Sequence, residues 1–275
     1  MRPLPILVTL SALAACQHSA YGPAPRRPIE GTQRDYACRY TREKPDLDGG
    51  LEDGVWATAP WSEPFLDAEG PDQDAPRHRT WFKMLWDERC LYVAALLEEP
   101  QVWATYDRRD MPVFHENDFE VLLDPDGDGM CLYELEVNAK GTIHDLYLHR
   151  PMAAGGPVLS QWNCEGLDGG VRVQGTLNQG DDTDRSWTVE MAIPWSCLKP
   201  PADAPSGPEA DRDRAELPHG TVWRVNFARV QWQVEWKDGA YHKVPGTRGQ
   251  TAAWTPQWST DMHRAEHWGH VRFTR

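Results

Sequence analysis

The sequence predicts an all-β fold, a two-sheet antiparallel β-sandwich. Apolar and polar residues alternate with period two in several segments, as in strands that turn one face to a core. The 275 residues include 22 glycines and 23 prolines, which indicates many turns. No segment keeps an apolar stripe with the 3.6-residue helical period over three turns. Many short strands separated by turns are typical of sandwiches and barrels.

The clearest alternation lies in residues 131–138, where Tyr133, Leu135 and Val137 are apolar and the residues between them are polar. Residues 171–177 and 187–193 alternate in the same way. Each segment is expected to form a strand with one face in the core. Six further segments are expected to be strands: residues 80–86, 91–97, 118–123, 142–148, 222–232 and 270–274.

Two proline-rich segments lack this pattern. Residues 16–34 are rich in Pro, Gly, Arg and Ala and are expected to form a tether that precedes one domain, residues 35–275. Residues 199–220 carry five prolines in a mostly charged stretch. Because strand patterns resume on both sides, we expect a long surface loop inserted in the domain.

The amino-terminal segment has the features of a lipoprotein signal peptide. A basic start is followed by an apolar stretch, residues 4–15, that ends in Leu13-Ala14-Ala15 before Cys16. The stretch is shorter than the roughly 20 residues that span a bilayer. We therefore expect cleavage after residue 15 and acylation of Cys16, which would anchor an exported protein. Gln17 favours the outer membrane, facing the periplasm or the surface; an ordinary cleaved signal is the alternative.

Composition narrows the class of partner. The formal net charge is −14, which argues against nucleic acid and anionic lipid because both require basic surfaces. Contact with a membrane is thus expected through the lipid anchor only. Fourteen tryptophans are compatible with flat surfaces that meet sugars, although Trp also fills sandwich cores.

Five cysteines remain after Cys16, and none has zinc or redox spacing. An oxidising compartment permits disulfides, and an odd number leaves at least one free thiol. The connectivity cannot be derived from the sequence.

Eight sequence blocks occur in an order that resembles the family 9 carbohydrate-binding modules and their bacterial relatives. They are residues 47–56, 84–95, 117–129, 133–139, 175–178, 187–195, 223–230 and 268–271, the first being LDGGLEDGVW and the third NDFEVLLDPDGDG. The resemblance covers about residues 36–275. It implies a non-catalytic antiparallel sandwich of the CBM9 and DOMON type, which in sugar-binding members holds a glycan end between aromatic rings.

The resemblance also implies site residues. Phe114 stands where sugar-binding members place one stacking ring, and Glu120 matches their sugar-bonding carboxylate. The second ring matches Met262, with Trp254 and Trp258 slightly upstream.

Pyranose C–H faces stack on aromatic rings while acids and amides bond the hydroxyls, so candidates of both kinds are considered. The ligand-binding candidates are Phe114, Glu120, Trp232, Trp254 and Trp258, with Glu136, Asn138 and Arg229 as polar partners. Structural packing is the alternative for each aromatic residue. A salt bridge between Arg229 and Glu120 or Glu136 is the alternative to ligand contact for these three. Six other tryptophans are assigned to the core: Trp56, Trp86, Trp187, Trp195, Trp223 and Trp268.

Asp124, Asp126 and Asp128 repeat the opening of a calcium loop, in which alternate carboxylates face one cation. An EF-hand would require an acid at the twelfth position, which is Leu135, and strands rather than helices flank the segment. A structural Ca²⁺ and a plain hairpin turn built from Asp, Pro and Gly therefore remain alternatives. No cofactor is required by either.

An enzyme has little support in the sequence. His263 to His267 fit the H-x-x-E-H pattern of inverted zinc peptidases, but only eight residues follow for a third ligand. No nucleophile elbow, phosphate loop or dinucleotide fingerprint is present. The sequence predicts a lipoprotein that binds a glycan without catalysis; an interaction domain without a sugar site is the alternative.

Overall fold

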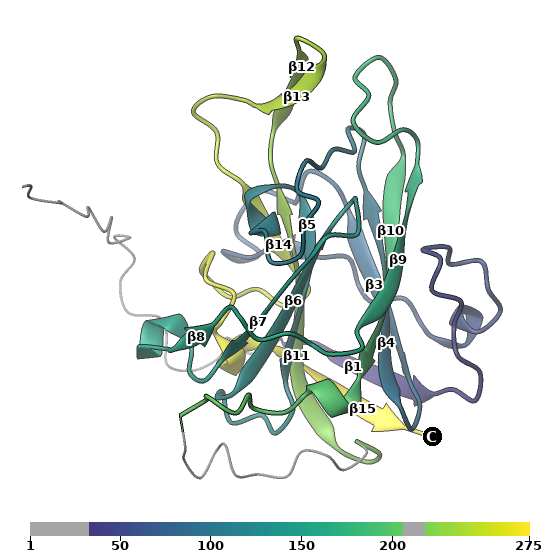
Figure 1. Cartoon of the computed structure of the whole chain (residues 1–275), viewed down its shortest axis with the longest axis vertical. Helices are drawn as coiled ribbons and strands as arrows, with labels where there is room; N and C mark the ends of the chain where they lie inside the picture. The colour runs from purple at the N-terminus through teal and green to yellow at the C-terminus, as the bar shows by residue number, and fades with distance from the viewer. Residues whose placement is uncertain (1–32, 206–217) are drawn as a thin grey trace, which may run out of the picture.

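The computed structural model describes residues 33–205 and 218–275 (Figure 1). The predicted signal peptide, Cys16, most of the tether and the centre of the predicted loop lie outside these ranges. The strands are β1 (Asp35–Tyr40), β2 (Leu66–Asp67), β3 (Thr80–Trp86), β4 (Cys90–Glu98), β5 (Asp118–Asp124), β6 (Leu132–Asn138), β7 (Ile143–Leu148), β8 (Val158–Leu159), β9 (Asp168–Gln174), β10 (Ser186–Pro194), β11 (Val222–Gln231), β12 (Val234–Lys237), β13 (Ala240–Lys243), β14 (Gln250–Ala253) and β15 (Gly269–Thr274). Five short 3-10 turns join them: η1 (Trp56–Thr58), η2 (Val113–His115), η3 (Met152–Ala154), η4 (Trp195–Cys197) and η5 (Ala265–His267).

The strands form one curled sheet whose two ends face each other, which confirms the predicted β-sandwich. The main strand order is β8-β7-β6-β5-β11-β15-β1-β3-β4-β10-β9, and β14 pairs with β11 and with β2. The first five strands make one layer and the last four make the other (Figure 1). A separate hairpin of β12 and β13 projects from one end. Among the described residues, no helix has the length and apolar character needed to cross a membrane.

The prediction of a purely antiparallel sandwich is wrong in one place. Strand β1 lies between β15 and β3 and runs parallel to both, so the sheet is mixed. Alternation along a strand indicates which face is buried, but it carries no information on the direction of a neighbour far away in the sequence.

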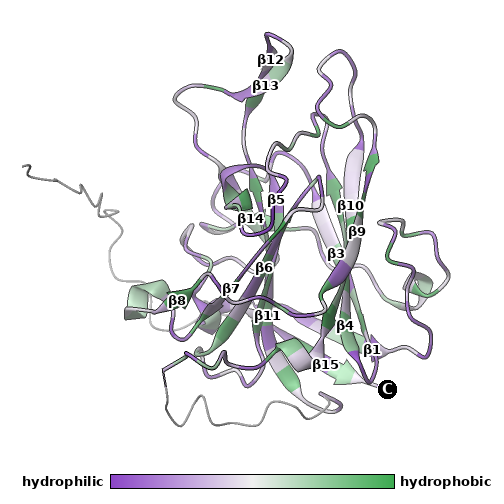
Figure 2. Ribbon diagram, in the orientation of Figure 1, coloured by the Kyte–Doolittle hydropathy of each residue, from purple (hydrophilic) through white to green (hydrophobic). Residues whose placement is uncertain are grey.

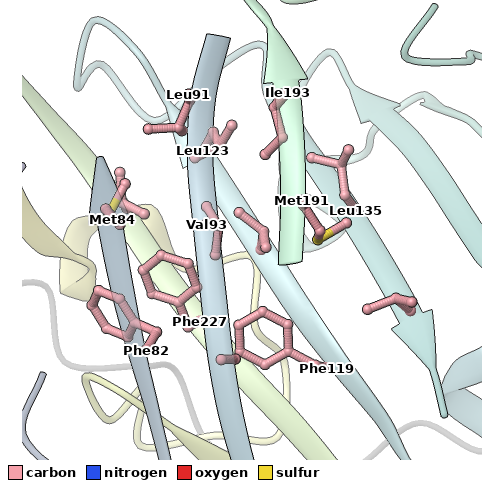
Figure 3. Close-up of a cluster of buried hydrophobic side chains, with 14 of the residues drawn as sticks. Phe82, Met84, Leu91, Val93, Phe119, Leu123, Leu135, Met191, Ile193 and Phe227 are labelled. Carbon is pink, nitrogen blue, oxygen red and sulfur yellow. The ribbon is translucent and has the colours of Figure 1, made fainter. Parts of the chain in front are cut away.

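The core lies between the two layers (Figure 3). Phe119 and Leu123 from β5 and Leu135 from β6 face Val93 from β4 and Met191 from β10. The alternation predicted for residues 131–138 and 187–193 is thus confirmed. Each of the six tryptophans assigned to the core is buried. Hydrophobic and hydrophilic residues are mixed along the strands, whereas the projecting loops are mostly hydrophilic (Figure 2).

Strand β9 differs from its prediction because it ends at Gln174 rather than at Leu177. Gly175 takes a φ of +151°, which favours glycine and turns the chain away. The Asp184 carboxylate accepts a hydrogen bond from the Thr176 backbone N–H at 2.7 Å and holds this bend. The sequence patterns also do not predict the short or terminal strands β1, β2, β8, β12, β13 and β14.

A buried acid explains the LDGG block. The Glu190 carboxylate accepts hydrogen bonds from Trp56 Nε1 at 2.5 Å and from the Gly49 backbone N–H at 2.8 Å. Gly49 has a φ of +82°, and a Cβ there would lie 2.5 Å from the backbone of Arg172. This block therefore fixes a loop to β10 and serves the fold.

A disulfide joins Cys164 to Cys197, a pairing that the sequence leaves open. Cys38 and Cys90 carry free thiols in the described part of the chain. The disulfide ties the loop before β9 to η4 after β10.

Candidate ligand-binding groove

A groove of about 600 Å³ lies on the face of β5, β6 and β11 that points away from the core. Its position follows from the alternation of these strands, since Phe119 and Val121 point inward and Glu120 between them points outward. The lining residues are Phe114, Glu120, Glu134, Glu136, Leu146, Met152, Val230, Trp232, Arg248, Gly249, Thr251, Thr260, Asp261, Met262 and His263.

The outer face of this layer is unusually well covered. The segment between β14 and β15 packs on it, and Met262, Ala265 and Trp268 join Leu122 and Leu146 in a second apolar cluster. This cover explains why Glu120, Glu134 and Glu136 are only 3 to 4% exposed although they lie on the polar face.

A row of ionisable groups crosses the floor of the groove. Glu120 on β5 lies directly opposite Glu136 on β6, and Glu136 lies opposite His144 on β7. His144 Nδ1 is 3.1 Å from the Glu136 carboxylate. Burial raises the pKa of Glu136 to about 7, and the contact with His144 works against this shift.

Glu134 belongs to a second ion pair at the groove wall. His263 Nε2 is 2.8 Å from the Glu134 carboxylate, and His263 Nδ1 is 3.0 Å from the Asp261 carboxylate. Burial disfavours the charged ring, but the two carboxylates outweigh it and raise the pKa of His263 to about 10. A charged His263 therefore fixes the segment that carries Met262 to strand β6.

Glu120 has no such partner. Its Oε2 atom is buried and has no hydrogen-bond partner among the described residues. Burial, and then the charges of Asp118, Glu134 and Glu136, raise the pKa of Glu120 well above its usual range. Asp118 Oδ2, two residues earlier on the same face, is also buried and has no hydrogen-bond partner within residues 33–205 and 218–275.

Apolar side chains form the walls. Phe114 lies in η2, is 38% exposed and contacts the ring of His144 at a centroid distance of 5.9 Å. Trp232 follows β11, and Lys243 Nζ lies 3.4 Å from the centre of its ring. Met152, which is 51% exposed, and Met262 complete the apolar lining.

Four of the predicted ligand-binding residues line the groove, and four do not. Phe114, Glu120, Glu136 and Trp232 line it. Met262, the match for the second ring, also lines it and provides a thioether instead of a ring.

Arg229 and Asn138 contact other parts of the domain and do not line the groove. Arg229 points to the opposite face of β11, is 1% exposed, and its guanidinium lies 2.6 Å from Glu99. It therefore forms no salt bridge with Glu120 or Glu136, because alternation places it inward like Phe227. Asn138 holds the turn after β6, where its Oδ1 accepts hydrogen bonds from the backbone N–H groups of Lys140 and Thr142.

Two predicted tryptophans pack elsewhere. Trp254 is fully buried and contacts Phe82 edge-on at 5.1 Å. Trp258 lies 5.1 Å from the ring of His267, and its indole packs beside Gly70. Neither ring lines the groove.

The sequence patterns did not indicate three of the ionisable residues that line the groove, Glu134, Asp261 and His263. Period two along β6 places Glu134 on the face of Glu136, so alternation could have indicated it. His263 stood out only through the H-x-x-E-H pattern. Its contact with Glu134 spans 129 residues, and no local pattern indicates such a contact.

The two histidines of that pattern have separate partners. His263 contacts Glu134 and Asp261, whereas His267 Nε2 lies 2.8 Å from the Arg264 guanidinium. Across residues 33–205 and 218–275, the acid cluster at residues 124–128 is the group with metal-ligand geometry. The histidine pair therefore provides no zinc site.

Asp124, Asp126 and Asp128 lie in the turn between β5 and β6. One oxygen from each carboxylate lies within 4.8 Å of the others. Asp124 accepts hydrogen bonds from the backbone N–H groups of Gly127 at 3.0 Å and Gly129 at 2.9 Å. Burial, with the charges of Asp126 and Asp128, raises the pKa of Asp124 to about 7. The residues fit a hard cation, and Asp124 also holds the turn itself.

Comparisons with known structures support the fold. A putative carbohydrate-binding protein from Bacteroides uniformis is 15% identical with a TM-score of 0.60, over 88% of this chain and 99% of that one. A family 9 carbohydrate-binding module from Caldicellulosiruptor kristjanssonii, solved with cellotriose, is 13% identical with a TM-score of 0.53, over 88% of this chain and 94% of that one. At these identities the likeness shows the fold. No curated protein matches the sequence.

A family model described as "Carbohydrate family 9 binding domain-like" matches residues 47–210, which is more than half of the chain. The matched segment includes β3 to β10 and therefore Phe114, Glu120 and the acids of β6. The chain belongs to the carbohydrate family 9 binding domain-like family.

Proposed function

We propose that this protein binds the end of a glycan in the groove and performs no catalysis on it. The observation that carries the proposal is the pairing of an exposed ring, Phe114, with a buried acid, Glu120, whose Oε2 has no partner among the described residues. The ring offers a surface for pyranose C–H groups, and the acid offers hydrogen-bond acceptors for hydroxyls.

The size of the groove supports the proposal. A volume of about 600 Å³ lies within the range of small-ligand sites, roughly 300 to 1,000 Å³. The lining combines apolar walls with a few convergent polar groups, as such sites require. The family match and the cellotriose complex of a module with the same fold point to the same ligand class.

We further propose that the domain is exported and anchored by lipid at Cys16, in the outer membrane or facing the periplasm. The support is the sequence Leu13-Ala14-Ala15-Cys16 after a short apolar stretch. A proline-rich tether of residues 16–34 would let the groove reach glycans at a distance from the bilayer.

A glycan array probed with the purified full-length chain tests the proposed function. We expect a small set of related glycans to bind, and calorimetric titration of a hit should show one site. Trp61→Ala is a suitable control, because Trp61 is 42% exposed and does not line the groove. Binding that depends on Trp61, or no binding to any glycan, would contradict the proposal.

A further inference from the structure

Two of the three groove glutamates have a histidine partner, and the third does not. Glu136 lies 3.1 Å from His144 Nδ1, and Glu134 lies 2.8 Å from His263 Nε2. Glu120 is 4% exposed, lines the groove, and its Oε2 has no partner in the described part of the chain. Among the described residues, Glu120 is thus the groove glutamate without a histidine partner.

This arrangement is costly for the unliganded protein. Glu120 lies directly opposite Glu136 in the antiparallel pair, where two charges would destabilise the sheet, and burial together with these neighbours favours the protonated form of Glu120 in the unliganded protein. Asp118 adds a further buried carboxyl on the same face, with its Oδ2 unpartnered among the described residues. A buried carboxyl group without a hydrogen-bond donor loses its hydration and gains no hydrogen bond in return. Such carboxyl groups are typical of binding sites.

The geometry favours an organic cation over a metal ion. Among the described residues, Asp124, Asp126 and Asp128 form the group of three or more possible metal ligands whose atoms all lie within 4.8 Å of one another. This group lies outside the groove. Phe114 lines the same groove as Glu120, so a cation there would meet aromatic surface as well as carboxylate, whereas the ring of Trp232 already faces Lys243.

We propose that the groove prefers a glycan end that carries a protonated amine, that is, an amino sugar without its acetyl group. This inference rests on the proposed function and narrows its ligand class. An ammonium group beside Glu120 stabilises the ionised carboxylate, so that Glu120 releases its proton on binding, and it brings three hydrogen-bond donors to a site rich in acceptors. The sugar ring stacks against Phe114, as in the proposed function.

Three β-1,4-linked disaccharides that differ only at C2 provide the test: cellobiose with hydroxyls, the chitosan dimer with amines, and N,N′-diacetylchitobiose with acetamides. They are titrated calorimetrically into the full-length chain at about pH 6, where an amine beside electron-withdrawing groups is protonated. We expect the amine dimer to bind at least about ten-fold more tightly than the other two, the gain of a charged hydrogen bond. Added salt should reduce this advantage.

Glu120→Gln keeps the shape of the side chain and removes the charge, so it should abolish the preference for the amine. Glu165→Gln is the matched control, because Glu165 is exposed and does not line the groove. It should keep the full preference. If the Glu120 variant does not fold, the three-ligand series on the wild-type chain alone decides.

Equal or tighter binding of cellobiose or of the acetamide dimer overturns this inference and leaves the proposed function standing. If none of the three disaccharides binds and an uncharged glycan on the array does bind, the inference is also overturned and the proposed function stands. A chain that binds no glycan at all overturns the proposed function as well.

Discussion

Phe114 and Phe119 show how two identical residues five positions apart take opposite roles. Phe119 points from β5 into the core and is fully buried, whereas Phe114 lies in η2 at the groove and is 38% exposed. Phe119 stacks near Phe227 at 5.9 Å, and Phe114 contacts only His115 and His144 among the described rings. Substitution of each residue can therefore separate an effect on binding from an effect on stability.

Phe114→Ala should weaken glycan binding about ten-fold or more, because a stacking ring contributes roughly 1 to 3 kcal/mol of apolar contact. Its melting temperature should change little, since the ring is partly exposed. Phe119→Ala is the matched control and should lose about 3 to 5 kcal/mol of unfolding free energy. Thermal melts and calorimetric titration of both variants provide the measurement; a large loss of stability in the Phe114 variant would contradict the groove assignment.

Among the elements, the turn between β5 and β6 has a structural role and carries a cluster of three acids. Asp124 holds the turn through the N–H groups of Gly127 and Gly129. Asp126 and Asp128 place two further carboxylates beside it. Mutual repulsion of three acids is relieved by a hard cation with oxygen ligands.

Calcium should therefore raise the melting temperature of the wild-type chain, and EDTA should reverse the rise. A free concentration about 100-fold above Kd adds about 2.7 kcal/mol to the unfolding free energy. Asp126→Asn should lose this response while keeping the turn, because Asp124 makes the hydrogen bonds to Gly127 and Gly129. A melting temperature that responds to neither calcium nor EDTA would show that the three aspartates only stabilise the turn.

At the level of the entire domain, several carboxyl groups are buried, and burial raises their pKa values. Burial raises the pKa of Glu120, and it raises the pKa values of Glu136, Asp124 and Glu190 to about 7. In each case burial is the largest cause, because desolvation disfavours the charged form. Bound glycan, cation or both would offset part of this cost in the groove and in the turn.

Stability of the unliganded protein should fall as the pH rises from about 6.5 to about 8. An acid with a raised folded pKa holds its proton in the folded state after the unfolded chain has lost it, so stability falls as the pH rises until the folded pKa is passed, which for Glu136, Asp124 and Glu190 is at about pH 7. His263, with a pKa raised to about 10, acts in the same direction above the ordinary His value of about 6.5. The lowered pKa of His78 opposes this only below about 6.5.

Differential scanning calorimetry across this range should show a drop of several degrees in melting temperature. Glu120→Gln should flatten the drop, because an amide cannot titrate. A melting temperature that rises between these pH values would show that the buried carboxyls do not control stability.

The proposed attachment to the membrane depends on Cys16, which lies outside the described residues. Cys16→Ala should abolish membrane association and leave an uncleaved or soluble precursor, since the acyl chains would have no attachment point. Cell fractionation and the mass of the mature amino terminus measure this. A mature wild-type protein that is soluble with an ordinary free amino terminus would contradict lipidation.

The β-sandwich class, the main strands and the face that each strand presents to the core could be predicted from the amino-acid sequence. Alternation is local, so Tyr133, Leu135 and Val137 could be assigned inward from their spacing alone. Phe114 and Glu120, which the resemblance implies as site residues, both line the groove.

The polar groups that become buried, and the partners that they contact, depend on the three-dimensional fold. Arg229 pairs with Glu99, 130 residues away, and Trp254 fills the core beside Phe82. The parallel pairing of β1 with β15 joins the two ends of the domain. Glu120 becomes a buried acid because the segment after β14 folds over the outer face of the sheet. Such burial depends on contacts between residues far apart in the chain, and period-two patterning describes neighbours only.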